Sequence, residues 1–229
     1  MDFSFLSKYW AYFNYGVLVT IMISACVVFF GTIIGVLVAL IKRSRIKVLD
    51  WLVSFYVWIF RGTPMVVQIM ISFVLLHFTN MPIVKFGVLD LDFSRLLPGI
   101  IVLSLNSGAY ISEVVRAGIE AVPKGQLEAG LSIGLTSEQT FVRIIAPQAF
   151  KVALPNITTA ILNLMRDAAL AYTIGFIDVM GKGNLLISRH LGNYSLETYT
   201  AVAFVYWGIA LILSLISRIA EQQLSVKER

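Results

Sequence analysis

Charged side chains and cysteines are scarce in this 229-residue chain. Asp, Glu, Lys and Arg make up 14% of it, hydrophobic residues make up 58%, and the mean hydropathy is +0.84. A soluble domain of average composition carries about 25% charged residues, so this composition indicates an integral membrane protein. The single cysteine, Cys26, excludes an internal disulfide and most thiolate metal sites.

Motifs for several kinds of catalysis are also missing. The two histidines, His77 and His190, lie in different segments without a carboxylate at ligand spacing, so nothing predicts a metal site. The sequence contains neither a GxSxG elbow nor a glycine-rich phosphate loop ending in GK[ST]. We therefore expect no enzyme activity and no bound cofactor, and we expect that the chain cannot hydrolyse ATP itself.

The net charge of +5 does not indicate nucleic-acid binding. The basic residues flank apolar runs and form no stripe with stacking aromatics, which is typical of residues that orient a protein in a bilayer. Four of them crowd the first connection: Lys42, Arg43, Arg45 and Lys47. The connections around 80–95 and 176–197 carry two basic residues each. The positive-inside rule then predicts an external N-terminus and a cytoplasmic C-terminus.

Long apolar runs predict an all-α membrane protein with five transmembrane helices. A bilayer core of about 30 Å needs about 20 helical residues. The predicted spans cover about 17–41, 63–78, 96–116, 154–175 and 198–217. No repeat, linker or shift in composition divides the chain, so we expect residues 1–229 to form a single transmembrane domain.

The second span is preceded by more apolar sequence than one crossing needs. Residues 48–79 would extend for about 48 Å as one helix. The stretch FRGTP at 60–64 interrupts them with an arginine that resists burial, a glycine and a proline. We expect 48–60, which is rich in aromatic residues (Trp51, Tyr56 and Trp58), to lie along the cytoplasmic interface and the span to begin near Thr63. The alternative is one long helix that is kinked at Pro64.

The longest polar interruption, EAGLSIGLTSEQTFVRIIAPQA at 128–149, predicts a pair of short helices. Gly134 can adopt a left-handed helix cap, and Thr136 followed by Gln139 is a capping box. Pro147 is expected to end the second helix, because proline cannot continue the hydrogen-bond ladder. The pattern therefore predicts an exposed cytoplasmic helix pair within a loop of about 120–150.

Polar side chains inside the third and fourth spans form the candidate substrate site. Asn106, Tyr110 and Glu113 share one face of the third span, and Asn163 and Asp167 share one face of the fourth, because they are spaced four or seven positions apart. The adjacent Arg166 and Asp167 point about 100° apart, so they are not expected to form a simple side-chain pair. At about 1.5 Å per residue, several of them lie near mid-membrane. Two interpretations remain: these residues bind a solute, or they form a structural polar network between helices. The candidates are Asn106, Tyr110 and Glu113 on the third span, and Asn163, Arg166 and Asp167 on the fourth.

Several stretches resemble a known transporter family. The segment EAGLSIGLTSEQTFVRIIAP resembles the cytoplasmic EAA loop of ABC-transporter permeases, although it has Gly130 where alanine is usual and Ala146 where leucine is common. Three further stretches are similar to the polar amino-acid uptake branch, which includes histidine-, glutamine-, arginine- and cystine-type permeases. They are FRGTPMVVQ at 60–68, SGAYISEVVRAGIEAVPKGQLEAG at 107–130 and RDAALAYTIG at 166–175. The resemblance covers about residues 15–220.

The resemblance implies a type I ABC importer permease of the bacterial inner (plasma) membrane. Such a subunit works by alternating access with a second permease copy or a paralogous permease, two cytoplasmic ABC ATPase subunits and an extracellular amino-acid-binding protein. Coupling to the ATPase is then expected from Glu128, Ala129, Gly134 and Pro147. The alternative is an ion-coupled secondary amino-acid transporter, which commonly shows two related halves.

The resemblance also bears on the substrate. ALAYTIG followed by DVMGKG is more similar to cystine-type permeases than to arginine or glutamine types. We expect Asp167 to attract the substrate's ammonium group, with Asn106 and Tyr110 lining the pocket. Where the family usually has a hydroxyl pair after the aspartate, this chain has Ala168 and Ala169. Backbone amides or Asn106 are the expected substitutes for hydroxyl contacts to the substrate carboxylate.

Overall fold

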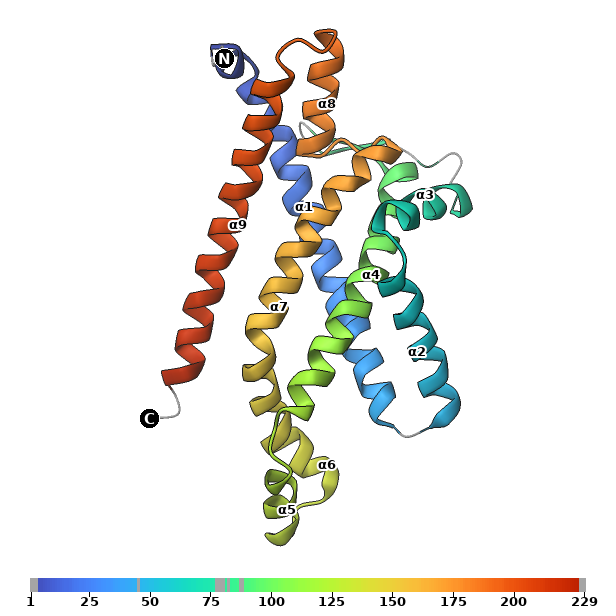
Figure 1. The fold of residues 1–229 in the computed structure, drawn as a ribbon, viewed down its shortest axis with the longest axis vertical. Helices are drawn as coiled ribbons and strands as arrows, with labels where there is room; N and C mark the ends of the chain where they lie inside the picture. The colour runs from blue at the N-terminus through green and yellow to red at the C-terminus, as the bar shows by residue number, and fades with distance from the viewer. Residues whose placement is uncertain (1–3, 45, 77–80, 82, 87–88, 227–229) are drawn as a thin grey trace.

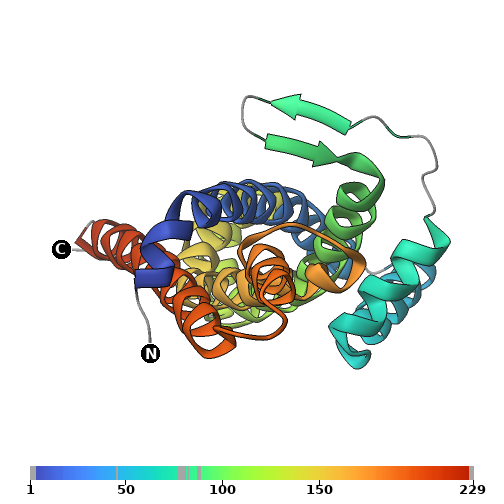
Figure 2. The same ribbon diagram turned by 90° about the horizontal axis from the view of Figure 1, so that it is seen from above.

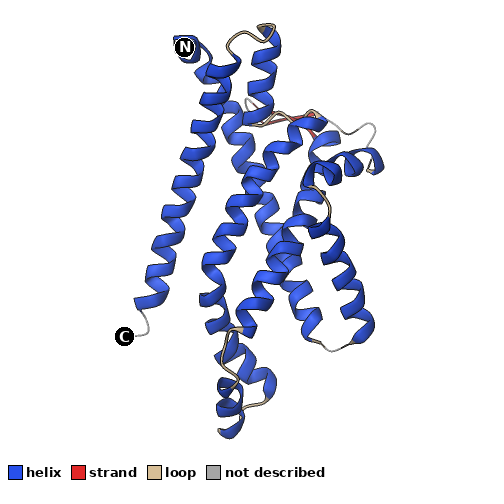
Figure 3. Ribbon diagram, viewed as in Figure 1, coloured by secondary structure: helices blue, strands red, loops and turns tan. Residues whose placement is uncertain are grey.

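Long helices run side by side through most of the protein in the computed structural model (Figures 1 and 3). The structure describes residues 4–44, 46–76, 81, 83–86 and 89–226. The α-helices are α1 (Ser4–Arg43), α2 (Lys47–Gly62), α3 (Met65–Leu75), α4 (Phe93–Glu120), α5 (Gly125–Ser132), α6 (Ser137–Thr140), α7 (Ala146–Ala168), α8 (Val179–Arg189) and α9 (Ser195–Val226). A π-helical turn η1 (Phe141–Ile145) precedes α7, and a 3-10 helix η2 (Ala169–Ile174) follows it.

The number of spans agrees with the sequence prediction. Within the described part of the chain, three helices, α1, α4 and α9, are long and apolar enough to cross a membrane by length and composition. Two bent pairs pass the same test together: α2 with α3, and Ser137–Ile174 with α8. Counting each pair as one span gives up to 5 spans.

The core lies where α4 packs against both α1 and α7. Val19, Ile23 and Val27 lie four positions apart on one face of α1, and they pack with Leu103 of α4 and Leu164 of α7. Helices in lipid gain little from excluding water between them, so close packing of small residues holds them together instead. This one-sided face of α1 therefore positions α4 beside it.

Two glycines of α1 allow α4 to approach closely. A Cβ atom added at Gly31 would lie 2.6 Å from Ser107 Oγ, and one added at Gly35 would lie 2.7 Å from Ile111 Cγ2. These positions are four residues apart and lie on one helix face. The close approach sets the height of Ser107 and its neighbours on α4 relative to α1.

The break between α2 and α3 is confirmed, but the predicted location of 48–60 is wrong. The two helices are bent by 113° at Thr63 and Pro64. Instead of lying along the interface, α2 runs back beside the second half of α1, and Val57 packs with Val38 and with Ala109 of α4 (Figure 1). The predicted end of the span near Phe78 lies outside the described residues.

A short hairpin departs from the all-α prediction. Strand β1 (Ile83–Phe86) pairs antiparallel with β2 (Leu89–Asp92), and Ile83 is opposite Asp92. Figure 2 shows it reaching out from the bundle just before α4. Asp92 ends the hairpin and begins α4, because its carboxylate accepts a hydrogen bond from the Ser94 backbone N–H at 3.0 Å.

Three helices are joined near the end of the molecule that holds the N-terminus. Asp178 is 1% exposed and caps α8 by accepting a hydrogen bond from the Gly181 N–H at 2.8 Å. Its other carboxylate oxygen accepts from the Tyr206 hydroxyl of α9 at 2.8 Å. The next residue, Val179, donates its N–H to Thr20 Oγ1 of α1 at 3.3 Å. These bonds hold α8 against both α1 and α9.

Candidate functional site

A cavity of about 250 Å3 lies between α4 and α7. It brings together most of the polar residues predicted from the sequence. Its lining consists of Asn106, Ser107 and Tyr110 from α4, and Ala160, Asn163, Leu164, Arg166 and Asp167 from α7. The pairing of α4 with α7 thus places the two predicted polar faces opposite each other.

The charged groups of this cavity are almost unpaired. Arg166 Nη1 lies 3.4 Å from Asn163 Oδ1, a long hydrogen bond, and the arginine is exposed. Among the residues that the structure describes, the half-buried Asp167 carboxylate has no hydrogen-bond or ion-pair partner. The cavity therefore offers one negative and one positive group to a ligand, and such a pair is complementary to a zwitterion.

Asn106 takes part in a structural network as well as lining the cavity. It is 7% exposed, and its Nδ2 atom donates to the Phe60 carbonyl at 3.0 Å and to Gln68 Oε1 at 2.9 Å. Our sequence interpretation did not single out Gln68, although it stands in the FRGTPMVVQ stretch. For Asn106, the structure thus supports a role in the packing of helices, which was the alternative interpretation.

Glu113 is not among the residues that line the cavity. Its carboxylate accepts a hydrogen bond from Lys42 Nζ of α1 at 2.7 Å and another from Arg116 Nη2 at 2.8 Å. Arg61 Nη1, at the end of α2, lies 4.0 Å from the same group. The ion pairs join α1, α2 and α4, and they occupy both oxygens of Glu113.

Ala168 and Ala169 mark a change of helix type. The α-helix α7 ends at Ala168 and continues as the 3-10 helix η2 from Ala169. Ala168 is 6% exposed and packs in the apolar core with Val27 and Leu96. Neither alanine lines the cavity, so a hydroxyl at Ala168 would point into apolar surroundings unless the helix rotated.

The predicted coupling helices lie at the opposite end of the molecule from the N-terminus (Figure 1). Gly134 has φ +86°, the left-handed conformation that was predicted. Thr136 and Gln139 form both hydrogen bonds of the capping box, with Thr136 Oγ1 accepting from the Gln139 N–H at 3.2 Å. Glu128 and Ala129 lie exposed on α5. These features give the turn between α5 and α6 a fixed geometry.

The prediction that Pro147 ends the second helix is wrong. Residues of α6, η1 and α7 follow one another with helical backbone angles, and Pro147 lies in the first turn of α7. Pro147 has no N–H, so an α-helical ladder could not satisfy the Arg143 carbonyl here. The chain widens into a π-helical turn instead, in which the Ala146 N–H bonds to the Phe141 carbonyl. Helix α6 is therefore continuous with α7.

Three large apolar side chains of the coupling loop are exposed. Leu131 is 46% exposed, Ile133 is 75% exposed and Val142 is 66% exposed. The base of the loop contacts α1, because the Arg43 guanidinium lies 3.6 Å from the centre of the Phe141 ring, within the range of a cation–π interaction. The loop thus exposes three apolar side chains, defined together as the apolar tip (Leu131, Ile133 and Val142), and it is also held against α1.

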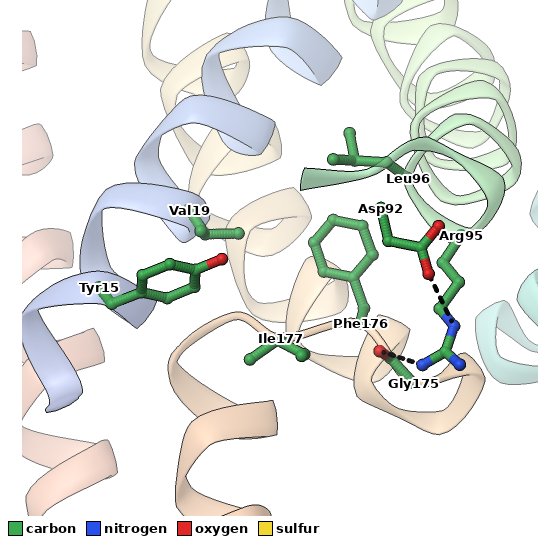
Figure 4. A pocket seen from close by; sticks show the side chains of 8 residues that line it. All are labelled: Tyr15, Val19, Asp92, Arg95, Leu96, Gly175, Phe176 and Ile177. Atoms are coloured by element: carbon green, nitrogen blue, oxygen red, sulfur yellow. Dashed lines mark hydrogen bonds and ion pairs between the residues drawn. The ribbon is translucent and has the colours of Figure 1, made fainter. Parts of the chain in front are cut away.

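A second, smaller cavity lies near the N-terminal end of the molecule (Figure 4). Arg95 bridges its wall: Nε lies 3.3 Å from Asp92 Oδ2, and Nη1 donates to the Gly175 carbonyl at 3.1 Å. Gly175 has φ +79°, and a Cβ atom there would lie 2.4 Å from Arg95 Nη1. The volume of about 50 Å3 suits a few water molecules, not an amino acid. Arg95 therefore joins α4 to the turn before α8.

Among the residues that the structure describes, no group of three or more His, Cys, Asp or Glu side chains could hold a metal ion. The polar groups that line the larger cavity are one carboxylate, one guanidinium, two amides and two hydroxyls. They can bind a polar solute by charge and hydrogen bonds.

Comparisons with known proteins identify the class of transporter. Residues 31–226 match the family described as "Binding-protein-dependent transport system inner membrane component". The L-cystine transport system permease protein TcyB of Bacillus subtilis is 36% identical over 217 residues, covering 95% of this chain and 88% of that protein. A putative glutamine transport system permease protein, GlnP of Rickettsia bellii, is 36% identical over 211 residues, covering 92% of each chain.

Solved structures agree with these sequence relatives. An amino acid ABC transporter crystallised with histidines has a chain that is 30% identical, with a TM-score of 0.84, covering 97% of this chain and 99% of that one. An inward-facing MetNI methionine ABC transporter shares the fold, with a TM-score of 0.74 at 18% identity, covering 93% of this chain and 95% of that one. The chain therefore belongs to the binding-protein-dependent transport system inner membrane components, as a permease of an amino-acid ABC importer.

Proposed function

We propose that this permease carries a polar amino acid, with L-cystine as the first candidate, through the cavity between α4 and α7. The observation that carries the proposal is the Asp167 carboxylate, which lines the same cavity as Arg166 and has no hydrogen-bond or ion-pair partner within the described part of the chain. A charged group inside a membrane protein is costly unless it is paired or hydrated, so it marks a functional site. An α-amino acid carries a charge complementary to each of the two side chains, because its ammonium group is positive and its carboxylate group is negative.

Each end of the substrate has its own partners. Asp167 attracts the ammonium group, while Arg166 and the Asn163 amide meet the carboxylate. Tyr110 is 45% exposed and offers a ring face to the substrate's side chain. The Arg61 guanidinium lies 5.3 Å from the centre of that ring and limits how far it can turn away.

The choice of L-cystine rests on the ALAYTIG and DVMGKG stretches at 169–175 and 178–183. A relative named for cystine and one named for glutamine are both 36% identical to this chain, so the comparisons support a polar amino acid without selecting one. Both substrate types share the zwitterionic backbone that the cavity groups fit. Cystine and glutamine differ in their side chains, so a direct comparison of the two as substrates is needed to identify which one is carried.

The family and the coupling helices support our proposal for the remaining partners. The apolar tip at Leu131, Ile133 and Val142 fits a groove of a cytoplasmic ATPase subunit, since an exposed apolar patch without a partner is unfavourable in water. Two such subunits hydrolyse ATP, a second permease copy or paralogue completes the pathway, and an extracellular binding protein delivers the amino acid. In this arrangement residues 1–229 form one transmembrane domain, with the coupling loop at about 120–150.

Direct binding tests the substrate proposal. The permease is purified with its ATPase subunits and without nucleotide or binding protein, and labelled L-cystine, L-glutamine, L-histidine and L-arginine are titrated in turn. Asp167→Asn should weaken the binding of the best ligand by about 30-fold or more, because a desolvated ammonium group loses its counter-charge. Asp50→Asn makes the same change at an exposed carboxylate on α2 and should leave affinity unchanged.

Two results would contradict the proposal. Wild-type affinity and uptake in the Asp167→Asn protein would show that the cavity is not the substrate site. Uptake that continues in vesicles lacking ATP or the ATPase subunits would favour an ion-coupled secondary transporter instead.

A further inference from the structure

Gln68 fills the break between α2 and α3 with hydrogen bonds. The side chain is 8% exposed, and its Nε2 atom lies 2.9 Å from the Phe60 carbonyl, 3.0 Å from the Thr63 carbonyl and 2.6 Å from Thr63 Oγ1. The Phe60 carbonyl needs such a donor. In an uninterrupted helix it would accept from residue 64, but Pro64 has no N–H. Gln68 therefore replaces part of the hydrogen bonding that Pro64 removes.

The same network fixes the orientation of the Asn106 amide. Asn106 Nδ2 lies 3.0 Å from the Phe60 carbonyl and 2.9 Å from Gln68 Oε1. A carbonyl oxygen can only accept, so the Asn106 atom facing Phe60 must be the NH2 group. Gln68 must likewise direct its own NH2 group to the carbonyls, which leaves its oxygen for Asn106. Both hydrogens of Asn106 Nδ2 are thus used within the network.

We propose that Gln68 is a positioning residue that makes Asn106 act only as an acceptor in the substrate cavity. Because both N–H groups are engaged, Oδ1 is the only polar side-chain atom of Asn106 that remains for a ligand. An acceptor binds the substrate's ammonium group and repels its carboxylate. Asn106 and Asp167 then form the ammonium side of the cavity, in contrast to our sequence expectation that Asn106 meets the carboxylate.

This inference rests on the proposed function and assigns a role that Gln68 performs without touching the substrate. The distance in sequence between Gln68 and Asn106 is 38 positions, and they meet only because α3 folds back at the break. Rotation of the Asn106 amide would expose an N–H donor to the cavity. Losing Gln68 should therefore weaken the binding of amino acids. It should also reduce the preference of the cavity for amino acids over ligands that lack the ammonium group.

The experiment uses the direct binding assay on the permease with its ATPase subunits, with labelled L-cystine as the probe and L-glutamine as the second probe. Gln68→Met keeps the length of the side chain and removes its donors and acceptor. We expect affinity to fall about tenfold, as for the loss of an oriented hydrogen bond to a charged group. The affinity of the desamino analogue of the probe, measured by competition, should change by less than about twofold, because that ligand has no ammonium group for Asn106 to bind.

The matched control is Tyr56→Phe. The Tyr56 hydroxyl also bonds from α2 to α4, donating to the Leu105 carbonyl, but Tyr56 does not line the cavity. A general loosening of the contact between α2 and α4 would affect this variant too, whereas the proposal predicts wild-type affinity. Thr63→Val is a milder second variant at an exposed position that removes one acceptor of Gln68 Nε2. It should weaken binding in the same direction by about threefold, and it serves if the Gln68→Met complex does not assemble.

A double-mutant cycle separates positioning from general structural support. If Gln68 acts through Asn106, then adding Gln68→Met to Asn106→Leu should weaken binding no further than Asn106→Leu alone. Additive losses would overturn the inference. Suppose that Asp167→Asn weakens binding while Gln68→Met and Thr63→Val keep wild-type affinity. This result would overturn the role of Gln68 and leave the proposed function intact. Wild-type affinity in all of these variants would reject the substrate site itself.

Discussion

Gly130 shows how one position adapts a shared loop to this chain. A Cβ atom at Gly130 would lie 2.4 Å from Thr140 Cγ2 and 2.7 Å from its Oγ1. Thr140 is 0% exposed, and its hydroxyl donates to the Thr136 carbonyl at 2.9 Å, so its side chain is held in place. Similar loops usually carry alanine where this chain has Gly130. Here the larger partner at Thr140 fills the space that the missing methyl group leaves.

We therefore expect Gly130→Ala to destabilise the packing of α5 against α6. Forcing one methyl group into a filled contact typically costs about 1–3 kcal/mol. Chemical unfolding of the purified permease, followed by protease cleavage within the loop, measures the loss. Thr140→Ala removes the two atoms, Cγ2 and Oγ1, that lie closest to the added methyl group. The double variant of Gly130→Ala with Thr140→Ala should therefore lose less stability than the sum of the two single losses. Additive losses would show that Gly130 and Thr140 do not compete for space.

Single residues differ in how far the sequence could predict their role. Asp167 and Asn106 could be recognised because polar groups inside an apolar run are rare. Gln68 could not, because its role depends on the carbonyl that Pro64 leaves unpaired and on an amide of another helix. Glu113 shares a helix face with Tyr110, but Lys42 and Arg116 bind it, and a helix face alone does not show which neighbour will cover it.

Secondary structure elements could be predicted better than their directions. Gly62 and Pro64 indicated the break between α2 and α3, and the structure has it there. The aromatic residues of α2 suggested the interface, but Trp51 and Trp58, which are 65% and 71% exposed, lie on a helix packed lengthwise against α1 and α4. Aromatic side chains suit both lipid and the interface, so composition does not distinguish the two placements.

The coupling helices lead to a prediction for the apolar tip. Ile133 is 75% exposed, so Ile133→Asp should leave the permease folded, inserted and at its normal abundance. A charge buried in an apolar interface without a partner is costly, so the variant should bind the ATPase subunits at least about tenfold more weakly. Co-purification of the ATPase with the tagged permease measures the binding of the two subunits directly. Uptake should fall in parallel.

Ile133→Leu is the matched control, because it keeps an apolar side chain of similar volume at the same position. It should retain ATPase binding and uptake near the wild-type level. Equal binding by the Asp and Leu variants would show that the tip is not the docking surface. The continuous helix from α6 through α7 would then need another contact with the ATPase.

At the scale of the whole molecule, the coupling helices and the N-terminus lie at opposite ends (Figure 1). An odd number of crossings requires the two chain ends to lie on opposite sides of the membrane, and the C-terminal end of α9 points toward the end that holds α5 and α6. Ion pairs around Glu113 and the Arg43 contact with Phe141 connect that end to the cavity helices. Movement of the coupling helices can therefore reach α1, α2 and α4 together.

The orientation of the molecule in the membrane gives the last prediction. The basic residues around Lys42 and Lys47 predict that this end faces the cytoplasm, so the turn after α8 should face outward. In a permease with Cys26→Ala, expressed without ATPase subunits, Leu191→Cys should react in intact cells with a thiol reagent that does not cross membranes, because Leu191 is 94% exposed. Ser137→Cys, on the exposed side of α6, should react only after the membrane is permeabilised. If Ser137→Cys were labelled in intact cells and Leu191→Cys were not, the topology would be the reverse of the predicted one. The coupling helices would then lie outside the cell, where no ATPase could bind them.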